Sequence, residues 1–591
     1  AEEYDRQYSD RVLIGRILGY FGPYRRTMLV TGVLILAMSG TGAVQPVLVS
    51  KGVDFMSRPG AAWLFFALPA AVIAVGFLHW LANWGRRRLT VRTIADVERD
   101  LRVDAFAAAV GHDLSFYDEY STGRVVSRIT SDTEEFSQLV ELVTGMFAQV
   151  FEAVILAAVL VRIQWTLSLV LCGMMPAVFL LAIAFRRIAR RVTRRGMRAM
   201  ADVNAAIKET VSGISVAKNF RQEGAIYGLF EEANSVSYRT NVTRGLVLNL
   251  IFPMLQGVGG LATAVLVYAG GLSAAEGLVT AGGWYLFLQS LDRFLFPVMQ
   301  LSSFWAQIQN GLSAAERVFA LMDAEQRVTQ RDDRPVPALE GRIDMETVTF
   351  AYPTGETVLK EFDLHMAPGE TVALVGHTSA GKSSIARLIA RFYEFQDGRI
   401  LVDGQDIRAF DLAAYRRRLG IVSQTPFLFS ETVAENIRYG RPDIADAEIL
   451  SLAKTIGDGD WLETMPNGLD THVGERGGRL SMGQRQLVAL MRVLVQKPAI
   501  FILDEATASV DPFTEWQIQQ ALNMILSRTT SVLIAHRLST VCSADRILVI
   551  DRGAILEEGS HEELLAAGGQ YAALYDTYFR HQSLAYIEQA H

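Results

Sequence analysis

The stretch TVALVGHTSAGKSSIARLIARF, residues 371–392, decides the fold of the second half of the chain. The apolar, β-favouring run at 371–375 predicts a buried strand, and the segment SSIARLIARF after it predicts a helix. Between them, GHTSAGKS fits the G-x-x-x-x-G-K-[ST] pattern of a phosphate loop, whose backbone N–H groups and following helix N-terminus attract phosphate. Since further β-favouring runs alternate with helical patterns, we predict an α/β nucleotide-binding domain with a phosphate loop.

The phosphate loop supplies most of the candidate nucleotide-binding residues. Lys382 is expected to contact the β- and γ-phosphates, and the Ser383 hydroxyl is expected to bind Mg²⁺. Ala380 stands where glycine is commoner, but it adds only a methyl group, so we expect a competent loop. The alternative is a chance match in an unrelated loop, which the flanking strand and helix disfavour. The candidate set is Gly376, His377, Thr378, Ser379, Ala380, Gly381, Lys382, Ser383 and Ser384.

The apolar run AIFILDEA at 499–506 supplies a second element of the same site. It predicts a buried strand that ends at Asp504, which we expect to hold Mg²⁺ through water. The next residue, Glu505, is placed to orient or deprotonate an attacking water beside the γ-phosphate. A strand followed by Asp-Glu means little alone, so this interpretation depends on the phosphate loop.

Long apolar runs in the first half of the chain predict membrane-spanning helices. At about 1.5 Å per residue, each run is long enough to cross roughly 30 Å of hydrocarbon. Arginines cluster after the second and fourth runs, whereas residues 270–279 contain no Lys or Arg. The positive-inside rule then places both ends of this half in the cytoplasm. The six predicted spans are 27–50, 62–85, 139–161, 165–185, 245–269 and 280–304.

The other segments divide the chain into five predicted parts. Apolar residues at helical spacing before Gly22-Pro23 predict an amphipathic helix at the inner membrane surface. The polar connections 86–138 and 186–244 are expected to continue the neighbouring spans as long intracellular helices. The predicted boundaries are 1–26 for the interfacial helix, 27–322 for the transmembrane domain, 323–341 for a charged linker, 342–580 for the nucleotide-binding domain and 581–591 for a tail.

Composition argues against several other classes of protein. The net charge of −7 over 591 residues gives no reason to expect nucleic acid as a partner. Only two cysteines are present, Cys172 and Cys542, so neither a disulfide framework nor a CxxC metal site is available. We expect both cysteines to be small buried hydrophobic residues.

A third motif, LSMGQRQ at 480–486, lies between the phosphate loop and the AIFILDEA run. In this order, and with six predicted spans before them, the three motifs make the chain resemble the ATP-binding-cassette (ABC) family. The resemblance covers essentially the whole chain and is to a half-transporter of the exporter type. It implies ATP and Mg²⁺ as cofactors and a second half-transporter as partner, in a homodimer or a paralogous heterodimer.

The resemblance also implies roles for single residues outside the phosphate loop. Tyr352 matches the aromatic residue that stacks on adenine, a role that suits a planar π-surface. Gln424 matches the glutamine that reaches Mg²⁺ and the lytic water. His536 matches the histidine that contacts the γ-phosphate and braces the catalytic glutamate.

Other matching segments would act across the dimer or toward the membrane. The motif LSMGQRQ corresponds to the signature of the family. Its residues Ser481, Gly483 and Gln484 would close over ATP held by the phosphate loop of the other subunit. Asp511 would lie in the loop that crosses the dimer interface. The segments 116–133 and 207–223 resemble intracellular loops whose short turns dock on the nucleotide domains as coupling helices.

Met482 interrupts the signature between Ser481 and Gly483. The backbone N–H is present whatever the side chain, and the start of a helix does not require positive φ, so the special freedom of glycine is not needed. We therefore expect Met482 to be tolerated. Because Lys382, Asp504, Glu505 and His536 are all present, the site is expected to hydrolyse ATP.

Polar residues inside the spans are the only indications of what is transported. Intramembrane charges are costly and often line pathways, so Glu152, Asp292 and Arg293 are candidates for a central cavity. The alternative is that they pair with each other or lie at the membrane edge. Asp292 and Arg293 are adjacent, hence about 100° apart around a helix, so each is expected to seek a partner on another helix. The residues are Gln45, His79, Asn83, Glu152, Asn249, Gln256, Asp292 and Arg293.

The function that the resemblance favours is ATP-driven export of amphipathic small molecules, lipids or drugs by alternating access. Membrane lipid and an amphipathic substrate are then the further partners. The expected location is the prokaryotic plasma (inner) membrane, with the nucleotide-binding domain in the cytoplasm. Two alternatives stay open: an importer of iron-siderophore complexes with the same architecture, and an ATP-gated channel or regulatory subunit.

Overall fold

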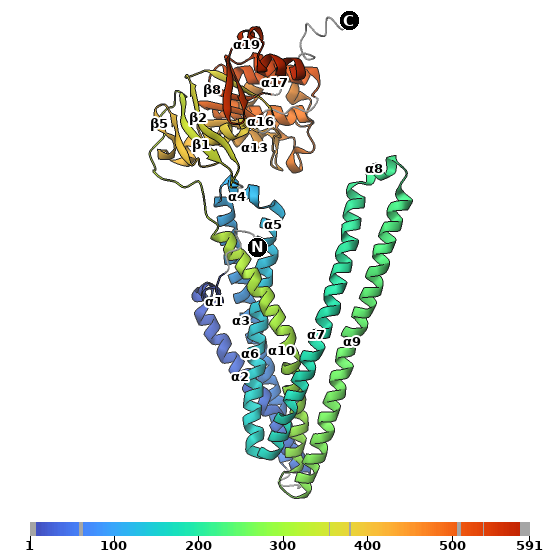
Figure 1. Ribbon diagram of the computed structural model, residues 1–591. Helices are drawn as coiled ribbons and strands as arrows, with labels where there is room; N and C mark the ends of the chain where they lie inside the picture. Colours follow the sequence, from blue (N-terminus) through green and yellow to red (C-terminus); the bar gives the residue numbers. More distant parts are fainter. Residues whose placement is uncertain are drawn as a thin grey trace. The chain divides into compact units, whose positions relative to one another are not determined.

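The computed structural model describes residues 8–57, 63–353, 355–377, 380–504, 510–535 and 537–579. The chain divides into two compact units (Figure 1). The first contains Ala1–Gly111 and Thr122–Ala324, and the second contains His112–Ser121 and Glu325–His591. The second unit therefore includes one short segment from within the helical half of the sequence.

The first unit is helical. Its long helices, such as the 48-residue α3 and the 53-residue α9, continue far beyond their apolar runs, as predicted for the intracellular connections. The main helices are α1 (Asp10–Tyr20), α2 (Arg25–Ser57), α3 (Leu64–Gly111), α5 (Thr122–Ser127), α6 (Thr133–Ile163), α7 (Trp165–Ser212), α8 (Ile214–Asn219), α9 (Glu223–Ala275) and α10 (Ala281–Met322).

Five segments are long and apolar enough to cross a membrane, judged by length and composition. The sixth predicted span, 280–304, lies in α10, where some side chains are outside the described set. The count of six therefore stays a prediction. The five segments are Gly22–Met56, Leu64–Gly111, Thr122–Ile163, Trp165–Ser212 and Gln256–Ala275.

Three helix pairs dominate the packing of the first unit. Helix α2 packs along α3, α6 along α10, and α7 along α9, with α8 at the tip of the last pair (Figure 1). The buried side chains of Leu156, Leu266 and Phe287 place α6, α9 and α10 around one core. Arg317 of α10 donates hydrogen bonds of 2.9 and 2.6 Å to the carboxylate of Asp132, which ties α10 to the start of α6.

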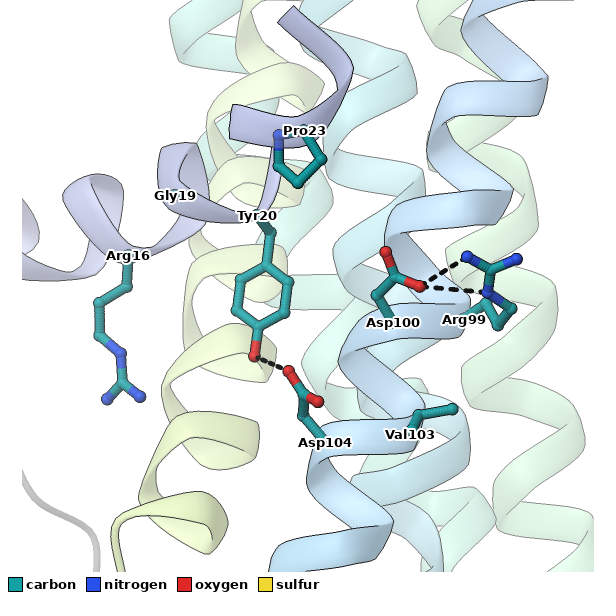
Figure 2. Close-up of a pocket in the computed structure, with 8 residues that line it drawn as sticks. All are labelled: Arg16, Gly19, Tyr20, Pro23, Arg99, Asp100, Val103 and Asp104. Carbon is teal, nitrogen blue, oxygen red and sulfur yellow. Dashed lines mark hydrogen bonds and ion pairs between the residues drawn. The ribbon is translucent and has the colours of Figure 1, made fainter.

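Helix α1 is held by polar side chains of two long helices. Arg16 forms an ion pair with Asp323, directly after α10. Tyr20 Oη donates to Asp104 of α3 at 2.9 Å (Figure 2). An open cavity of about 630 Å³ lies between α1 and α3. The helix is therefore fastened to the unit by its polar residues, and the cavity is lined by groups that already have partners.

The apolar residues of α1 point in two directions. Leu13 is buried, as is Phe21 directly after the helix, whereas Ile14 and Leu18 are exposed. One apolar face thus contacts the unit, and the other is available for a membrane surface. The predicted interfacial location stays a prediction.

The second unit is built on two sheets. The larger has six strands in the order β10-β9-β3-β8-β7-β6, with parallel pairing from β9 to β6 and antiparallel pairing of β10 with β9. The smaller is antiparallel, in the order β2-β1-β4-β5. The predicted strand at 371–375 is confirmed as β3, and the predicted α/β fold class is confirmed with it.

The bounds of the elements in the second unit follow the chain. The strands are β1 (Ile343–Ala351), β2 (Thr357–Met366), β3 (Thr371–Val375), β4 (Asp397–Val402), β5 (Gln405–Asp406), β6 (Leu419–Val422), β7 (Ile500–Asp504), β8 (Thr530–Ile534), β9 (Arg546–Asp551) and β10 (Ala554–Gly559). The helices are α4 (Leu114–Glu119), α11 (Lys382–Ile389), α12 (Leu412–Arg416), α13 (Val433–Arg438), α14 (Asp446–Lys454), α15 (Asp460–Glu463), α16 (Met482–Gln496), α17 (Pro512–Leu526), α18 (Leu538–Cys542), α19 (His561–Ala567) and α20 (Gln570–Leu574).

Side chains of the parallel strands alternate between two buried layers. In β7, Ile500 and Ile502 join a cluster with Ile385 of α11, whereas Phe501 and Leu503 join a cluster formed with α16 and α17. Both faces of the strand are thus covered, which explains why its sequence is continuously apolar and does not alternate with polar residues.

The two cysteines differ from the expectation. Cys172 of α7 and Cys542 of α18 are both free and exposed, so the predicted burial is wrong. The preceding residues, Leu171 and Val541, take the buried positions at these turns of their helices.

The predicted linker 323–341 is irregular, but hydrogen bonds attach its end to the second unit. The carboxylate of Asp403 accepts hydrogen bonds from three consecutive backbone N–H groups, at 2.8, 3.0 and 2.8 Å. These donors belong to Glu340, Gly341 and Arg342. The linker therefore enters β1 from a fixed direction.

We predict that Asp403→Ala frees this end of the linker. Three backbone donors lose a charged acceptor, and each such hydrogen bond contributes about 1.5–3 kcal/mol. Hydrogen–deuterium exchange of the full chain in lipid should show faster exchange at 340–342. Asp403→Asn keeps one acceptor oxygen and should retain part of the protection; equal exchange in both variants and wild type would contradict the prediction.

Candidate functional site

The candidate nucleotide site lies at the carboxyl edge of the six-stranded sheet. Register places Leu374 of β3 and Asp504 of β7 on either side of Ile534 of β8, so the ends of the three parallel strands are level. With strands about 4.8 Å apart, the two outer strands are roughly 10 Å from each other. The phosphate loop, which begins at Gly376, and Asp504 therefore share one edge, where open α/β sheets bind ligands.

The remaining catalytic candidates follow neighbouring strands at this edge. His536 comes two residues after the end of β8, and Gln424 comes two residues after β6 and is exposed. Asp504 is half-buried. Glu505 and His536 lie outside the described residues, so their roles stay predictions.

The phosphate loop requires glycine at its first position. Gly376 has φ +148°, and a Cβ added there would lie 2.1 Å from the carbonyl oxygen of Ile550. At the other end, Gly381 has φ +104° and caps the N-terminus of α11. Ala380 is buried in the core and is not among the residues with positive φ, so its methyl group is accommodated. Thr378 and Ser379 lie outside the described residues.

The lysine of the loop is folded back onto the backbone. Lys382 Nζ donates to the carbonyl oxygens of Gly376 and His377 at 2.8 and 2.7 Å. Burial lowers the pKa of Lys382, and the negative charge of Asp504 offsets part of this effect. An ammonium group inside a loop that opens a helix is a setting that favours an anion with several oxygens.

The donor atoms at this edge suit Mg²⁺ held together with phosphate. Ser383, Gln424 and Asp504 offer hydroxyl, amide and carboxylate oxygens, the ligand types that Mg²⁺ takes, and few protein ligands suffice when phosphate supplies others. Among the described residues, no three His, Cys, Asp or Glu side chains gather to form a metal site of their own. The chemistry of the edge therefore fits a metal that arrives with a nucleotide.

Tyr352 connects to the phosphate-loop helix. Its hydroxyl lies 2.9 Å from the Ser384 hydroxyl, at the third position of α11. Its ring packs edge-on against Phe350 and Tyr393, with centroid distances of 4.8 and 5.4 Å. The half-buried ring is thus held firmly beside the start of α11.

The signature stretch begins helix α16, and Met482 is its first residue. The Ser481 hydroxyl accepts from the N–H of Gln484, and the Gln484 amide oxygen accepts from the N–H of Ser481, which forms a capping box. Met482 has no positive φ, as expected from its place at a helix start. Met482 therefore leaves the backbone of the signature undisturbed.

Gly483 is required for a reason that its sequence context did not reveal. A Cβ there would lie 2.3 Å from the Thr514 methyl of α17. The N–H of Thr514 also donates to the Asp511 carboxylate at 2.9 Å, which lowers the pKa of Asp511. Gly483 and Asp511 thus place the starts of α16 and α17 against each other.

Sequence reasoning did not single out Thr514 and Tyr393. Neither belongs to a short motif, and each acquires its role from a contact distant in sequence. The aromatic pair Phe392-Tyr393 directly after α11 was the available signal for the second, because aromatic residues at the end of a buried helix often contact a neighbouring element.

Comparison with known families matches both halves of the chain. The family described as "ABC transporter transmembrane region" matches residues 28–298, and the family described as "ABC transporter" matches residues 359–508. The chain belongs to the ABC transporter family. It is a half-transporter of the exporter type, an integral membrane protein that couples ATP hydrolysis to transport.

Individual relatives of this ABC transporter span nearly the same length. The "Fatty acid ABC transporter ATP-binding/permease protein" of Mycobacterium bovis is 35% identical over 89% of this chain and 82% of its own length. An "ATP-dependent lipid A-core flippase" of Desulfotalea psychrophila is 30% identical over 96% of this chain and 100% of its own. The structure of a bacterial Atm1-family ABC exporter with ATP bound superposes with a TM-score of 0.75 at 29% identity, over 94% of this chain and 98% of that one.

We predict that substitutions at two neighbouring signature positions of this ABC transporter differ in their effect on ATPase activity. Gly483→Ala places a methyl group against Thr514 and should cost about 1–3 kcal/mol of packing at the start of α16. We expect the ATPase rate in lipid to fall at least about fivefold, which corresponds to 1 kcal/mol. Met482→Ala should stay within about twofold of wild type, because alanine suits a helix start. Loss of ATPase activity in Met482→Ala, or wild-type activity in Gly483→Ala, would contradict these expectations.

Proposed function

We propose that this half-transporter exports amphipathic, lipid-like molecules. The observation that supports this substrate class is the full-length similarity to a protein named a fatty acid transporter and to proteins named lipid A-core flippases. A fatty acid and a lipid with a polar headgroup share one property, namely a long apolar part joined to a polar group. A pathway for such molecules needs apolar walls and few fixed charges.

The charged residues within the predicted spans agree with this proposal. Arg293 of α10 forms an ion pair with Glu152 of α6 and donates to the carbonyl oxygen of Gly42 in α2 at 3.1 Å. A Cβ at position 42 would lie 2.9 Å from the Glu152 carboxylate, so the missing side chain makes room for the pair. Each of these charges has a partner on another helix, as expected for Arg293, whereas Asp292 is exposed. The pairing favours a structural role for Glu152 and Arg293.

A second half-transporter is the expected partner, as the half-transporter architecture suggests. Large apolar side chains on the α7–α8–α9 hairpin support this, because an isolated soluble surface seldom exposes so many together. Each of them is at least 60% exposed: Val211, Val216, Phe220, Tyr227 and Leu229. A dimer would cover such residues. A homodimer with two equivalent sites and a heterodimer with a related chain both fit.

In the proposed mechanism, different residues at the sheet edge bind phosphate, bind the metal and activate water. MgATP supplies the phosphoanhydride bond whose hydrolysis drives transport. Lys382 would exchange its backbone carbonyls for phosphate oxygens, and Ser383, Gln424 and Asp504 would hold the metal, which would neutralise phosphate charge. Glu505 orients and deprotonates the attacking water, while His536 braces that glutamate.

The other proposed nucleotide contacts come from Tyr352, the proposed platform for adenine, and from the signature motif LSMGQRQ. Tyr352 stacks on adenine beside α11. Ser481, Gly483, Gln484 and Asp511 complete the site of the other subunit, since α16 and α17 present their N-termini together. The proposed location is the bacterial inner membrane with the nucleotide-binding domain in the cytoplasm, which the arginine distribution and the bacterial relatives support.

We predict that Glu505→Gln lowers ATPase activity of the purified chain in lipid by at least about 100-fold, the usual size of a general-base contribution. ATP binding should persist, because the amide keeps the shape of the carboxylate. Native mass spectrometry of the same sample would give the stoichiometry. Transport should be measured in proteoliposomes with fluorescent fatty acid or lipid, using Glu505→Gln as the inactive control.

The outcomes of this experiment separate the candidate functions. Movement away from the nucleotide side would support export, and ATP-driven movement of an iron-siderophore complex toward it would establish the importer instead. Turnover that persists in Glu505→Gln would contradict the proposed base. ATP binding with no turnover in wild type would favour a channel or regulatory subunit, provided that the dimer is present.

We predict that Glu152→Gln lowers the thermal stability of the first unit, because it leaves the Arg293 charge without its carboxylate inside a membrane helix bundle. The double variant Glu152→Gln with Arg293→Gln removes both charges and should recover most of the loss. Substrate-stimulated ATPase activity of the double variant should stay near wild type. Its complete loss would instead place the pair in the substrate pathway.

A further inference from the structure

A chain of contacts links the proposed adenine platform to helix α4, a segment that lies between two helices of the membrane half in sequence but belongs to the second unit. Tyr393 is 4% exposed, and its hydroxyl donates to the carboxylate of Asp118 in α4. The ring of Tyr393 meets the Tyr352 ring edge-on, with centroids 5.4 Å apart. Tyr352 in turn contacts Ser384 at the start of α11.

The N-terminus of helix α4 is anchored by a carboxylate that also binds the linker. Asp113 caps its N-terminus and also accepts hydrogen bonds from the backbone N–H groups of Arg327 and Val328, at 2.7 and 3.0 Å. Burial opposes the charge of Asp113, but the hydrogen bonds prevail and lower its pKa. Helix α4 and the beginning of the linker therefore share one carboxylate.

The surroundings of Tyr393 keep it a donor in a fixed orientation. The Arg387 guanidinium of α11 lies 5.9 Å from the centre of its ring. Phe350 packs against the ring at 5.9 Å between centroids. Burial, together with the hydrogen bond to Asp118, raises the pKa of Tyr393, so the phenol keeps its proton at physiological pH.

We propose that Tyr393 is a positioning residue that makes α4 respond to the base of the nucleotide, and not only to its phosphates. A base stacked on Tyr352 would restrict that ring, the edge-on contact would restrict Tyr393, and the hydrogen bond would fix Asp118. Phosphates alone would order the loop and α11 but would leave Tyr352 uncovered. The inference rests on the proposed role of Tyr352 as the adenine platform.

A comparison of two ligands separates this link from simple docking of α4. The full-length protein in lipid nanodiscs is saturated with Mg²⁺ and either the non-hydrolysable ATP analogue AMP-PNP or inorganic triphosphate, which lacks a base. Hydrogen–deuterium exchange is then read from the peptides that cover 112–121 and 376–392. We expect AMP-PNP to slow exchange in α4 about fivefold more than triphosphate does, the size of effect that one buried hydrogen bond provides.

Tyr393→Phe should abolish the difference between the two ligands at 112–121 and leave protection of 376–392 intact. Tyr415→Phe is the matched control, because it also removes a buried tyrosine hydroxyl, one that donates to Ile389 O at 2.8 Å and does not contact α4. This control should keep the ligand difference. If Tyr393 only anchored α4, loss of its hydroxyl would speed hydrogen–deuterium exchange of α4 equally with both ligands.

The possible failures are distinguishable. Equal protection of α4 by AMP-PNP and triphosphate in the wild type would overturn the inference while leaving ATP binding established. A ligand difference that survives in Tyr393→Phe would also overturn it. If neither ligand protected 376–392, the proposed nucleotide site itself would fail, and the inference with it.

Discussion

The nucleotide half of the molecule depends on the parallel alignment of β3, β8 and β7. Because Leu374 and Asp504 flank Ile534 in register, the loop after one strand and the carboxylate at the end of another meet at a single edge. Reversing the direction of β3 or of β7 would send one of the two groups to the opposite edge of the sheet. Both faces of the strands are packed by apolar side chains, which fixes this register and leaves the edge as the place for polar chemistry.

Close backbone approaches set the geometry around that edge. Gly376 lies against the carbonyl of Ile550, and Gly483 lies against Thr514, so at both places a single methyl group would force elements apart. Ala380 and Met482, by contrast, have no positive φ. The need for glycine at a motif position therefore follows from the space beside it and from its φ.

The membrane half and the nucleotide half use charge differently. Within the spans, Arg293 and Glu152 satisfy each other across α10 and α6, and Gly42 makes room for them. In the second unit, carboxylates such as Asp113 and Asp403 collect backbone N–H groups and fasten the ends of the linker. The ion pair neutralises two charges within predicted membrane spans. The hydrogen bonds of Asp113 and Asp403 instead hold the linker rigidly in the second unit, and Asp113 does so at the start of α4, the helix to which the proposed link runs.

The sequence by itself determined the parts that depend on local pattern. The strand, loop and helix at 371–392, the apolar runs, the irregular linker and the helix start at Met482 all follow from hydrophobic period, glycine placement and helix-start chemistry, which act within a few residues. The prediction that the cysteines are buried was wrong, because composition does not tell which side of a helix faces the core. Tertiary structure alone decided the Glu152–Arg293 pair, the contact of Gly483 with Thr514 and the link from Tyr352 through Tyr393 to Asp118. In each of these the partners come from separate helices or strands, and only packing brings them within reach of each other.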